Sequence, residues 1–507
     1  MRNGELIAKE KKLGFLGTIE RVGNKLPHPF ILFLYIIAGL IAITTVMSFA
    51  GVSVINPKGE VVLVRNLLSK EGLIWILSNL LKNFSGFAPL GLVLAMQLAV
   101  GFSEQSGLLP TFLRKAILGV PIWALSATVI FFGINGSIAS EAAIVIIPAL
   151  AAAAFQAKGK NPLVGLIAGY AATNAGFTAS IIVAGTDVLL AGVTQEAARI
   201  IDPSITVNPA MNWYFMIAST FILTIVGMWV SDKIIAPRLG TYKGAEVANE
   251  RQITDVEKKG LRNAGIFTLV YILLLAIMVV PSNGILRDAQ TGSIVPSPFL
   301  DGLVAILIIY FISVGLVYGK TVGTIKSANE IPAKMAEAIA PLTGYIVLVF
   351  VIAQFIAIFN YTNLGMVIAV NGAKMLKSAG LTGIPLIISM ILMTTFVNLF
   401  MSSGSAKWYI FAPIFVPMFM MLGYSPAFAQ VVYRIGDSAT NPITPIYAYM
   451  PIIIGMAQKY DKNVGMGTII SLMLPYTIAF LCVWILQMIA WIVFNIPLGP
   501  GAALFLN

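Results

Sequence analysis

The chain has 507 residues, of which 58% are apolar and 10% are charged, and its mean hydropathy is +0.91. A soluble domain is about half apolar and about a quarter charged, so this apolar excess indicates side chains that face lipid. The composition excludes a soluble enzyme, a disulfide-stabilised secreted domain and a disordered protein. The single cysteine, Cys482, and the single histidine, His28, also exclude multi-histidine metal sites and Ser–His relays.

Apolar segments recur along the chain with about the 20 residues that a helix needs to cross a membrane. The first runs from 29 to 50, after a charged N-terminus without a cleavable signal peptide. Two longer stretches, 116–157 and 383–422, carry small polar residues at their centres, which predicts re-entrant hairpins. We predict an all-α polytopic membrane protein with nine transmembrane helices and two re-entrant helical hairpins, the other spans being 87–103, 163–192, 211–231, 263–281, 299–318, 341–359, 426–452 and 468–495.

The formal net charge of +11 has its simplest explanation in basic cytoplasmic loops, so no nucleic-acid partner is expected. With the N-terminus inside, the segments assigned to the cytoplasm hold 22 of the 32 Lys and Arg residues, and the external segments hold 8. The remaining two, Lys407 and Arg434, fall inside the membrane. This asymmetry predicts a cytoplasmic N-terminus and an external C-terminus.

The segments then have distinct expected roles. Amphipathic stretches at 72–84, 328–340 and 363–379 are predicted to lie at the membrane surface. The predicted divisions are a cytoplasmic N-terminus (1–28), a first span with an interfacial helix (29–86), a first repeat (87–231), a solvated cytoplasmic linker (232–262), scaffold spans (263–340), a second repeat (341–495) and an external C-terminus (496–507).

The two repeats share polar interruptions. A Gly-Ser pair marks the centre of each hairpin, and an Ala-Thr-Asn triplet interrupts the span that follows. Ser137 precedes Asn174 by 37 residues, and Ser405 precedes Asn441 by 36. The predicted topology sends the two copies in opposite directions, and inverted repeats with broken helices are typical of secondary transporters. We therefore expect Asn174 and Asn441 to approach each other near the midplane.

Ionisable side chains at membrane depth cost about 2.5–3.5 kcal/mol each on insertion scales, so each needs an explanation. Arg434 and Asp437 are three residues apart and therefore neighbours on one helix face. Two interpretations stay open. The residues form a structural ion pair, or Arg434 binds a substrate carboxylate through its planar fork while Asp437 binds Na⁺ or a proton.

The uncharged polar residues also have two interpretations each. The amide oxygens of Asn174 and Asn441 suit a hard-cation shell, although asparagine is also a simple helix breaker. Ser137 and Ser405 either contact a ligand at the hairpin tips or only cap helices.

Three further residues near the interruptions stay ambiguous. Trp408 either stacks on an aromatic ligand or packs structurally. Asp187 is a proton-handling acid or an ordinary interfacial residue, and Glu141 is a coupling carboxylate or an acid of a first helical turn.

Several long motifs resemble those of one family. They are RVGNKLPHPF at 21–30, NFSGFAPLG at 83–91, TDVLL at 186–190, FAPIFVPMF at 411–419 and PLGPG at 497–501. These stretches resemble the AbgT family, the p-aminobenzoyl-glutamate transporters of bacterial inner membranes, almost from end to end. The resemblance implies a homodimer in the ion-transporter superfamily, whose members are described as p-aminobenzoyl-glutamate importers and as sulfonamide exporters.

The resemblance also implies roles for single residues, while Glu141 and Lys407 depart from the family pattern and their roles stay open. The positions that match family motifs are Asp187, Asn398, Ser405, Trp408, Pro426, Arg434, Asp437 and Asn441. Together with the repeat argument, the resemblance assigns substrate binding to Ser137, Asn174, Ser405, Trp408, Pro426 and Arg434. It assigns the coupling ion or proton to Asp187, Asp437, Asn398 and Asn441. Of these, Asp437, Asn398 and Asn441 form a candidate Na⁺ site.

The sequence thus predicts a secondary transporter, not an enzyme, for p-aminobenzoyl-glutamate or a related aromatic carboxylate. The expected ion is Na⁺ or H⁺, no other cofactor is expected, and the direction of transport is open. An ion channel is the alternative, because re-entrant hairpins occur there too. An intramembrane enzyme is disfavoured, because the sequence contains no His-Glu-x-x-His motif, Asp-rich pair or Ser–His pairing.

Overall fold

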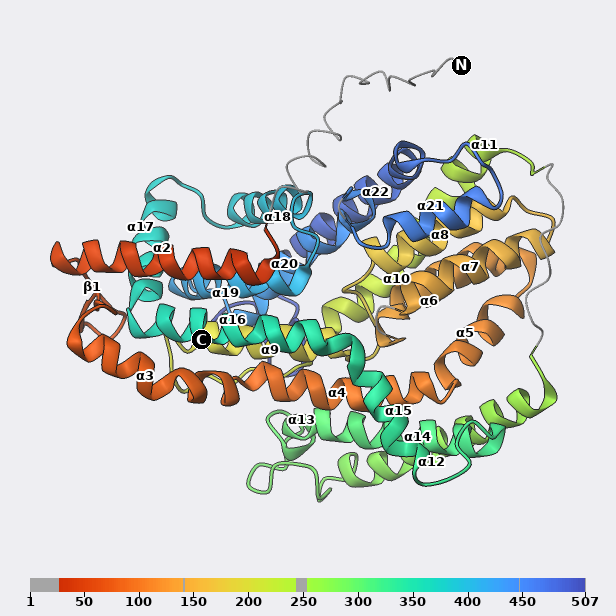
Figure 1. The fold of residues 1–507 in the computed structure, drawn as a ribbon, viewed down its shortest axis with the longest axis horizontal. Helices are drawn as coiled ribbons and strands as arrows, with labels where there is room; N and C mark the ends of the chain where they lie inside the picture. The colour runs from red at the N-terminus through yellow and green to blue at the C-terminus, as the bar shows by residue number, and fades with distance from the viewer. Residues whose placement is uncertain (1–26, 140–141, 243–252, 446, 507) are drawn as a thin grey trace, which may run out of the picture.

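The computed structural model describes residues 27–139, 142–242, 253–445 and 447–506. The predictions for residues 1–26 and for Glu141 lie outside these ranges. The described chain is almost entirely helical (Figure 1), as predicted. Its only strands are the antiparallel pair β1 (Ser53–Ile55) and β2 (Val61–Leu63), which link the first two helices.

Helices of two kinds alternate along the chain, long apolar ones and short ones next to breaks. The first half contains α2 (Pro29–Phe49), α3 (Lys70–Ser85), α4 (Ala88–Gln105), α5 (Leu108–Leu118), η1 (Ile122–Ala124), α6 (Leu125–Ile134), η2 (Asn135–Ala139), α7 (Ala142–Ala157), α8 (Pro162–Ala175), α9 (Gly185–Ala198), α10 (Trp213–Val230), η3 (Ser231–Ile235) and α11 (Ala236–Leu239). The second half contains α12 (Asp255–Val279), α13 (Pro298–Asp301), α14 (Leu303–Val322), α15 (Glu330–Ile339), η4 (Ala340–Leu342), α16 (Thr343–Tyr361), α17 (Leu364–Ser378), α18 (Ile384–Asn398), α19 (Gly404–Met421), α20 (Pro426–Ala439), η5 (Asn441–Ile443), α21 (Met450–Gln458) and α22 (Met466–Val493).

Seven helical segments of the described chain are long and apolar enough to cross a membrane, or eight if the bent pair α5–α6 counts as one span. The seven overlap seven of the predicted spans. The other two predicted spans are broken, 163–192 into α8 and α9, and 426–452 into α20, η5 and α21. Pro442 explains the second break, because proline lacks the N–H that a continuing helix needs.

Both predicted hairpins consist of a helix, a break and a second helix. In the first, η2 separates α6 from α7. In the second, residues 399–403 separate α18 from α19. At the second break, the Ser403 hydroxyl accepts a hydrogen bond from the Ala406 N–H and so caps α19.

The predicted linker at 232–262 is helical at both of its ends. The helix that begins at Trp213 continues through a π-helical turn, η3, to Leu239. At the other end, α12 begins at Asp255 with a capping box, in which Thr254 and Glu257 each accept a hydrogen bond from the other's backbone N–H. The sequence analysis missed this capping signal, and residues 232 and 262 both lie inside helices.

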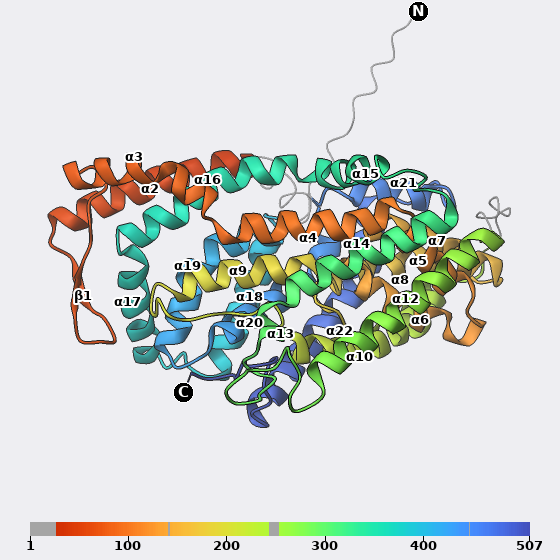
Figure 2. The ribbon, with the colours of Figure 1, turned by 90° about the horizontal axis from the view of Figure 1, so that it is seen from below.

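Helices α8 and α20, each next to a break, are buried along their whole length, whereas long α12 is mostly exposed. Helix α16 packs against α2 and α3 on one flank, and α17 runs across their direction (Figures 1 and 2). On another flank, α12 and α14 pack together and α14 packs against α4. Only 6% of the apolar window of α12 is buried, so its many exposed aliphatic side chains are suited to lipid.

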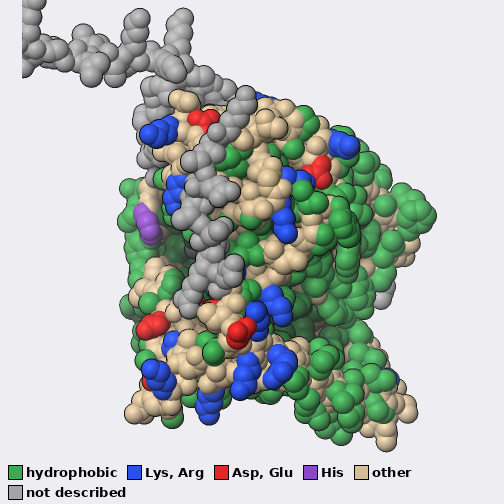
Figure 3. Space-filling view, turned by 90° about the vertical axis from the view of Figure 1, so that its right-hand side faces the viewer, with side chains coloured by type: hydrophobic (Ala, Val, Ile, Leu, Met, Phe, Trp, Pro, Cys, Tyr) green, Lys and Arg blue, Asp and Glu red, His purple; other side chains and the backbone are tan. Residues whose placement is uncertain are grey.

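Charged side chains gather at one end of the molecule. Figure 3 looks at the end where α5 and α7 finish and α12 begins, and Lys and Arg side chains are prominent on it. Arg114 of α5 and Glu257 of α12 form an ion pair there at 3.7 Å. Apolar side chains border this charged end, as expected where a membrane protein leaves the lipid.

Close packing of α7 and α8 generates the first prediction. A Cβ atom built on Gly169 of α8 would lie 2.9 Å from the Cα of Pro148 in α7, and neither backbone can give way easily. Gly169→Ala should therefore destabilise the protein by about 1–3 kcal/mol, measured as a lower melting temperature in detergent.

Gly39→Ala is the matched control, because a Cβ on Gly39 of α2 meets nothing within 4 Å among the described residues. The same substitution there should be neutral or stabilising by up to about 1 kcal/mol through helix propensity. Equal shifts at both positions would contradict the packing argument.

Candidate functional site

Helix α20 is buried along its whole length. All 14 of its residues are buried, although they include Arg434 and Asp437. It packs against α18, α19, α22, α8 and α9, so its charged face meets protein on every side. It begins at Pro426, where the Ser425 hydroxyl accepts a hydrogen bond from the Phe428 N–H, and it ends just before Asn441.

Arg434 does not pair with Asp437, contrary to the structural ion pair considered from the sequence. Its Nη2 donates to Oδ1 of Asp187 at 2.5 Å and to the carbonyl oxygen of Thr178 at 2.7 Å. The side chain is only 2% exposed. The helical spacing made Asp437 a neighbour, but the guanidinium extends away from α20 toward the break between α8 and α9.

Asp187 lies in the first turn of α9, immediately after this break. Its Oδ2 accepts a hydrogen bond from the Ala184 N–H at 2.7 Å, and its residue is buried. A carboxylate is favoured at this end of a helix. The side chain of Asp187 therefore lies among buried polar groups.

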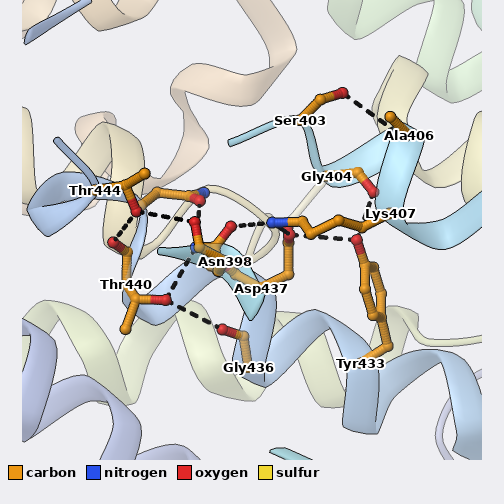
Figure 4. A network of polar contacts seen from close by, with 12 residues as sticks. Asn398, Ser403, Gly404, Ala406, Lys407, Tyr433, Gly436, Asp437, Thr440 and Thr444 are labelled. Carbon is orange, nitrogen blue, oxygen red and sulfur yellow. Dashed lines mark hydrogen bonds and ion pairs between the residues drawn. The ribbon is translucent and has the colours of Figure 1, made fainter. Parts of the chain in front are cut away.

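Asp437 has its own partner, Lys407 of α19 (Figure 4). The Lys407 Nζ lies 2.6 Å from Asp437 Oδ1, and the lysine side chain is 0% exposed. The Tyr433 hydroxyl lies 3.2 Å from the same oxygen and also donates to the Gly404 carbonyl. A Cβ on Gly404 would lie 2.7 Å from Asp437 Oδ2, so this glycine allows the carboxylate to approach the tip.

Asn398 joins the second hairpin to the second broken helix. Its side-chain oxygen accepts a hydrogen bond from Lys407 Nζ. Its Nδ2 lies 2.7 Å from the Asp437 carbonyl oxygen, 2.9 Å from Thr440 Oγ1 and 2.8 Å from Asn441 Oδ1. The three predicted Na⁺ ligands are thus adjacent, and the ammonium of Lys407 contacts two of them.

The two helix breaks meet, which confirms the expected approach of Asn174 and Asn441. Asn441 Nδ2 lies 3.5 Å from the Asn174 carbonyl oxygen, and the hydroxyls of Thr178 and Ser438 are 2.6 Å apart. Two buried atoms here have no hydrogen-bond partner within the described part of the chain, Asn174 Oδ1 and Arg434 Nε. Unsatisfied buried polar atoms are uncommon, and a ligand is one explanation for them.

The other predicted site residues are less central. Trp408 is fully buried, stacks on Tyr433 with ring centroids 4.5 Å apart and donates from Nε1 to Thr194, so the packing interpretation describes this structure. Ser405 lies in the first turn of α19, with its hydroxyl 3.4 Å from that of Ser403. Ser137 is partly buried in η2, and Pro426 is eight residues from Arg434, about 12 Å along α20.

Little free space remains at the cluster. A cavity of about 10 Å³ lies next to Asp187 and is lined by Ser180, Asn212 and Trp213 among others, which is about the room for one water molecule. A larger cavity of about 440 Å³ lies at Lys160, Asn161 and Asp232, near the turn between α7 and α8. The side chains of Lys407, Arg434 and Asp437 are also buried, so the cluster is closed to a substrate in this conformation.

The comparisons with known proteins agree with the motifs in the sequence. The sequence model of the AbgT transporter family matches residues 14–506. The chain belongs to this family. It is a family of multi-pass membrane transporters, and the resemblance inferred from the motifs is confirmed.

Relatives with names and structures are similar over nearly their whole length. The p-aminobenzoyl-glutamate transport protein of Escherichia coli K12 is 46% identical over 486 residues, which is 96% of each chain. The Alcanivorax borkumensis YdaH transporter matches with a TM-score of 0.90 and 38% identity over 94% of this chain and 100% of its own. Neisseria gonorrhoeae MtrF, described among antimetabolite efflux pumps, matches with a TM-score of 0.90 and 42% identity over 96% and 100%.

Several polar residues of the cluster escaped the sequence analysis. Tyr433 precedes Asp437 by four residues, so helical periodicity alone could have placed it on the same face. Thr178 and Ser438 lie in or next to the broken spans, and no spacing indicated that they would meet. The pairing of Lys407 with Asp437 joins different helices and also had no local signal.

The Arg434–Asp187 pair generates the second prediction. Asp187→Asn should destabilise the protein by about 3–5 kcal/mol, because it leaves a buried guanidinium without its counter-charge. Adding Arg434→Gln to Asp187→Asn should lower the stability by much less than a further ~3–5 kcal/mol, because neither buried charge then remains. Melting temperatures of the two single variants and the double variant in detergent measure this coupling.

Arg199→Gln serves as the control for the double-mutant cycle. It breaks the partly exposed Arg199–Glu196 pair at 3.1 Å and should cost less than about 1 kcal/mol. Strictly additive losses at Asp187 and Arg434 would show that the two side chains do not stabilise each other.

Proposed function

We propose that this chain is a secondary active transporter for p-aminobenzoyl-glutamate or related aromatic carboxylates in the bacterial inner membrane, driven by an ion gradient. The printed name of the Escherichia coli relative supports the substrate class. The description of MtrF supports a related role in the efflux of antimetabolites such as sulfonamides. Import and export by one alternating-access carrier differ only in the direction of the gradients.

The observation that carries this proposal is the state of Arg434. One side of its guanidinium is bound to Asp187 and Thr178, while Nε is buried without a partner among the described residues. A guanidinium binds carboxylates through two parallel hydrogen bonds. A substrate carboxylate would therefore use the unpaired donor and compete with Asp187 for the charge of Arg434.

The proposed architecture is a homodimer whose subunits have nine spans, two re-entrant hairpins and inverted repeats. The matched spacing of the two Ala-Thr-Asn triplets and the contact between Asn174 and Asn441 support the inverted repeats. Irregular backbone at membrane depth needs polar partners. Two broken helices and two tips that share one cluster satisfy that need.

The proposed orientation places the charged end seen in Figure 3 in the cytoplasm, with the N-terminus there and the C-terminus outside. The excess of Lys and Arg in the corresponding loops supports this orientation. Amphipathic α15 and α17 then lie at the membrane surfaces, whereas α3 packs alongside α16 and leads into α4.

The closed cluster has a place in this function. With space for about one water beside Asp187, a substrate can enter only after the tips or broken helices move, as alternating access requires. Asp187 and Asp437 are the buried acids that could respond to the coupling ion.

Arg434→Lys tests the proposal. The charge stays but the two-pronged geometry is lost, so the affinity for p-aminobenzoyl-glutamate should fall at least about tenfold, the equivalent of one good hydrogen bond to a charged group. Binding of labelled p-aminobenzoyl-glutamate to purified protein and its uptake into proteoliposomes with imposed ion gradients give the measurements.

Arg199→Lys is the matched control, since this residue lies far along α9 from Asp187 and is 40% exposed. It should bind and transport as the unmodified protein does. Unchanged binding by a folded Arg434→Lys protein would reduce Arg434 to a structural partner of Asp187. Separately, an ionic current through the unmodified protein far above a carrier's turnover would favour a channel.

A further inference from the structure

The ammonium group of Lys407 occupies a site built from oxygen atoms. Asp437 Oδ1 lies 2.6 Å from Nζ, and the side-chain oxygen of Asn398 accepts a hydrogen bond from it. Lys407 comes from the second hairpin tip, while Asp437 comes from the broken helix α20 (Figure 4). A carboxylate and an amide oxygen are the ligands that a hard cation such as Na⁺ prefers.

This position is electrostatically unfavourable for a lysine on its own helix. Lys407 lies in the first turn of α19, where the helix dipole favours negative charge and opposes a cation. Burial adds a desolvation cost, since the side chain is fully enclosed. The contacts of the ammonium with Asp437 and Asn398 offset both costs. These oxygen atoms, and not the dipole of α19, therefore stabilise the charge of Lys407 at this position.

The first half of the chain has no such cation. With the triplets Ala-Thr-Asn aligned, Tyr170 corresponds to Asp437, and with the Gly-Ser pairs aligned, Ala139 corresponds to Lys407. The charged pair is therefore confined to one half, as expected for a single cation position rather than a structural feature of every tip.

We propose that Lys407 is a tethered cation that fills the Na⁺ position between Asp437 and Asn398, so that this chain works without Na⁺. The pair is neutral as it stands, and a second cation beside it would be repelled in a region of low dielectric constant. Removing the lysine side chain would leave an unpaired carboxylate next to amide oxygens and would open a Na⁺ site. The inference rests on the proposed function only in that Na⁺ is one ion such a transporter could use.

Lys407→Ala tests the inference through binding rather than transport. Purified variants are titrated with NaCl against choline chloride at constant ionic strength and pH, and the melting temperature is followed. The Lys407→Ala protein should show a saturable rise with Na⁺, because a cation that binds only the folded state stabilises it. The unmodified protein and Lys407→Arg, which keeps a tethered cation, should show none.

A second substitution identifies the ligand. In the double variant Lys407→Ala and Asp437→Asn, the Na⁺ response should disappear, because the carboxylate that would bind Na⁺ is gone. A folded Lys407→Ala protein without a Na⁺ response would overturn the inference. So would a saturable Na⁺ response of the unmodified protein that Asp437→Asn abolishes.

The experiment remains decisive if Lys407→Ala does not fold. Binding of ²²Na⁺ to the unmodified protein and to Asp437→Asn then gives the answer, since the inference requires that the unmodified protein has no specific binding that Asp437→Asn abolishes. No measurement here uses an organic substrate. Failure of p-aminobenzoyl-glutamate transport would therefore count against the proposed function and leave the cation result intact.

Discussion

Helix α20 must bury two opposite charges one turn apart without exposing either to lipid, and much of the fold follows from this constraint. Arg434 and Asp437 each take a partner from a different helix, Asp187 of α9 and Lys407 of α19. A buried charge without a partner costs several kcal/mol, so these contacts fix α9 and α19 against α20. The long apolar helices then separate this polar centre from the lipid.

Charges and helix breaks gather at the same place for one physical reason. Broken helices free backbone N–H and C=O groups, and within a membrane those groups need polar partners from the protein. The first tip supplies Asn135, whose Oδ1 accepts from the Ile181 N–H of the break before α9. The second tip is joined by Asn398 to the break after α20. Each break thus provides polar groups that stabilise the other elements of the cluster.

The sequence predicted what depends on local pattern and missed what depends on tertiary contact. Hydropathy identified seven long helices, and the repeated triplets identified the meeting of Asn174 and Asn441. Helical spacing offered Asp437 as one possible partner of Arg434, whereas the actual partner, Asp187, is 247 residues away in the sequence and had no local signal. The capping box at Thr254 was a local signal that could have located the start of α12.

The two ion pairs also explain how a closed protein can be ready for a charged ligand. On the proposed function, Asp187 occupies the guanidinium when no substrate carboxylate is present, and Lys407 occupies the oxygen site in place of a free cation. Exchanging one partner for another keeps every buried charge paired, so the exchange avoids the full cost of an isolated ion. The arrangement differs between the two pairs in one respect. A carboxylate ligand can leave, whereas the lysine is covalently attached, so only the Arg434 side of α20 can alternate between an internal and an external partner.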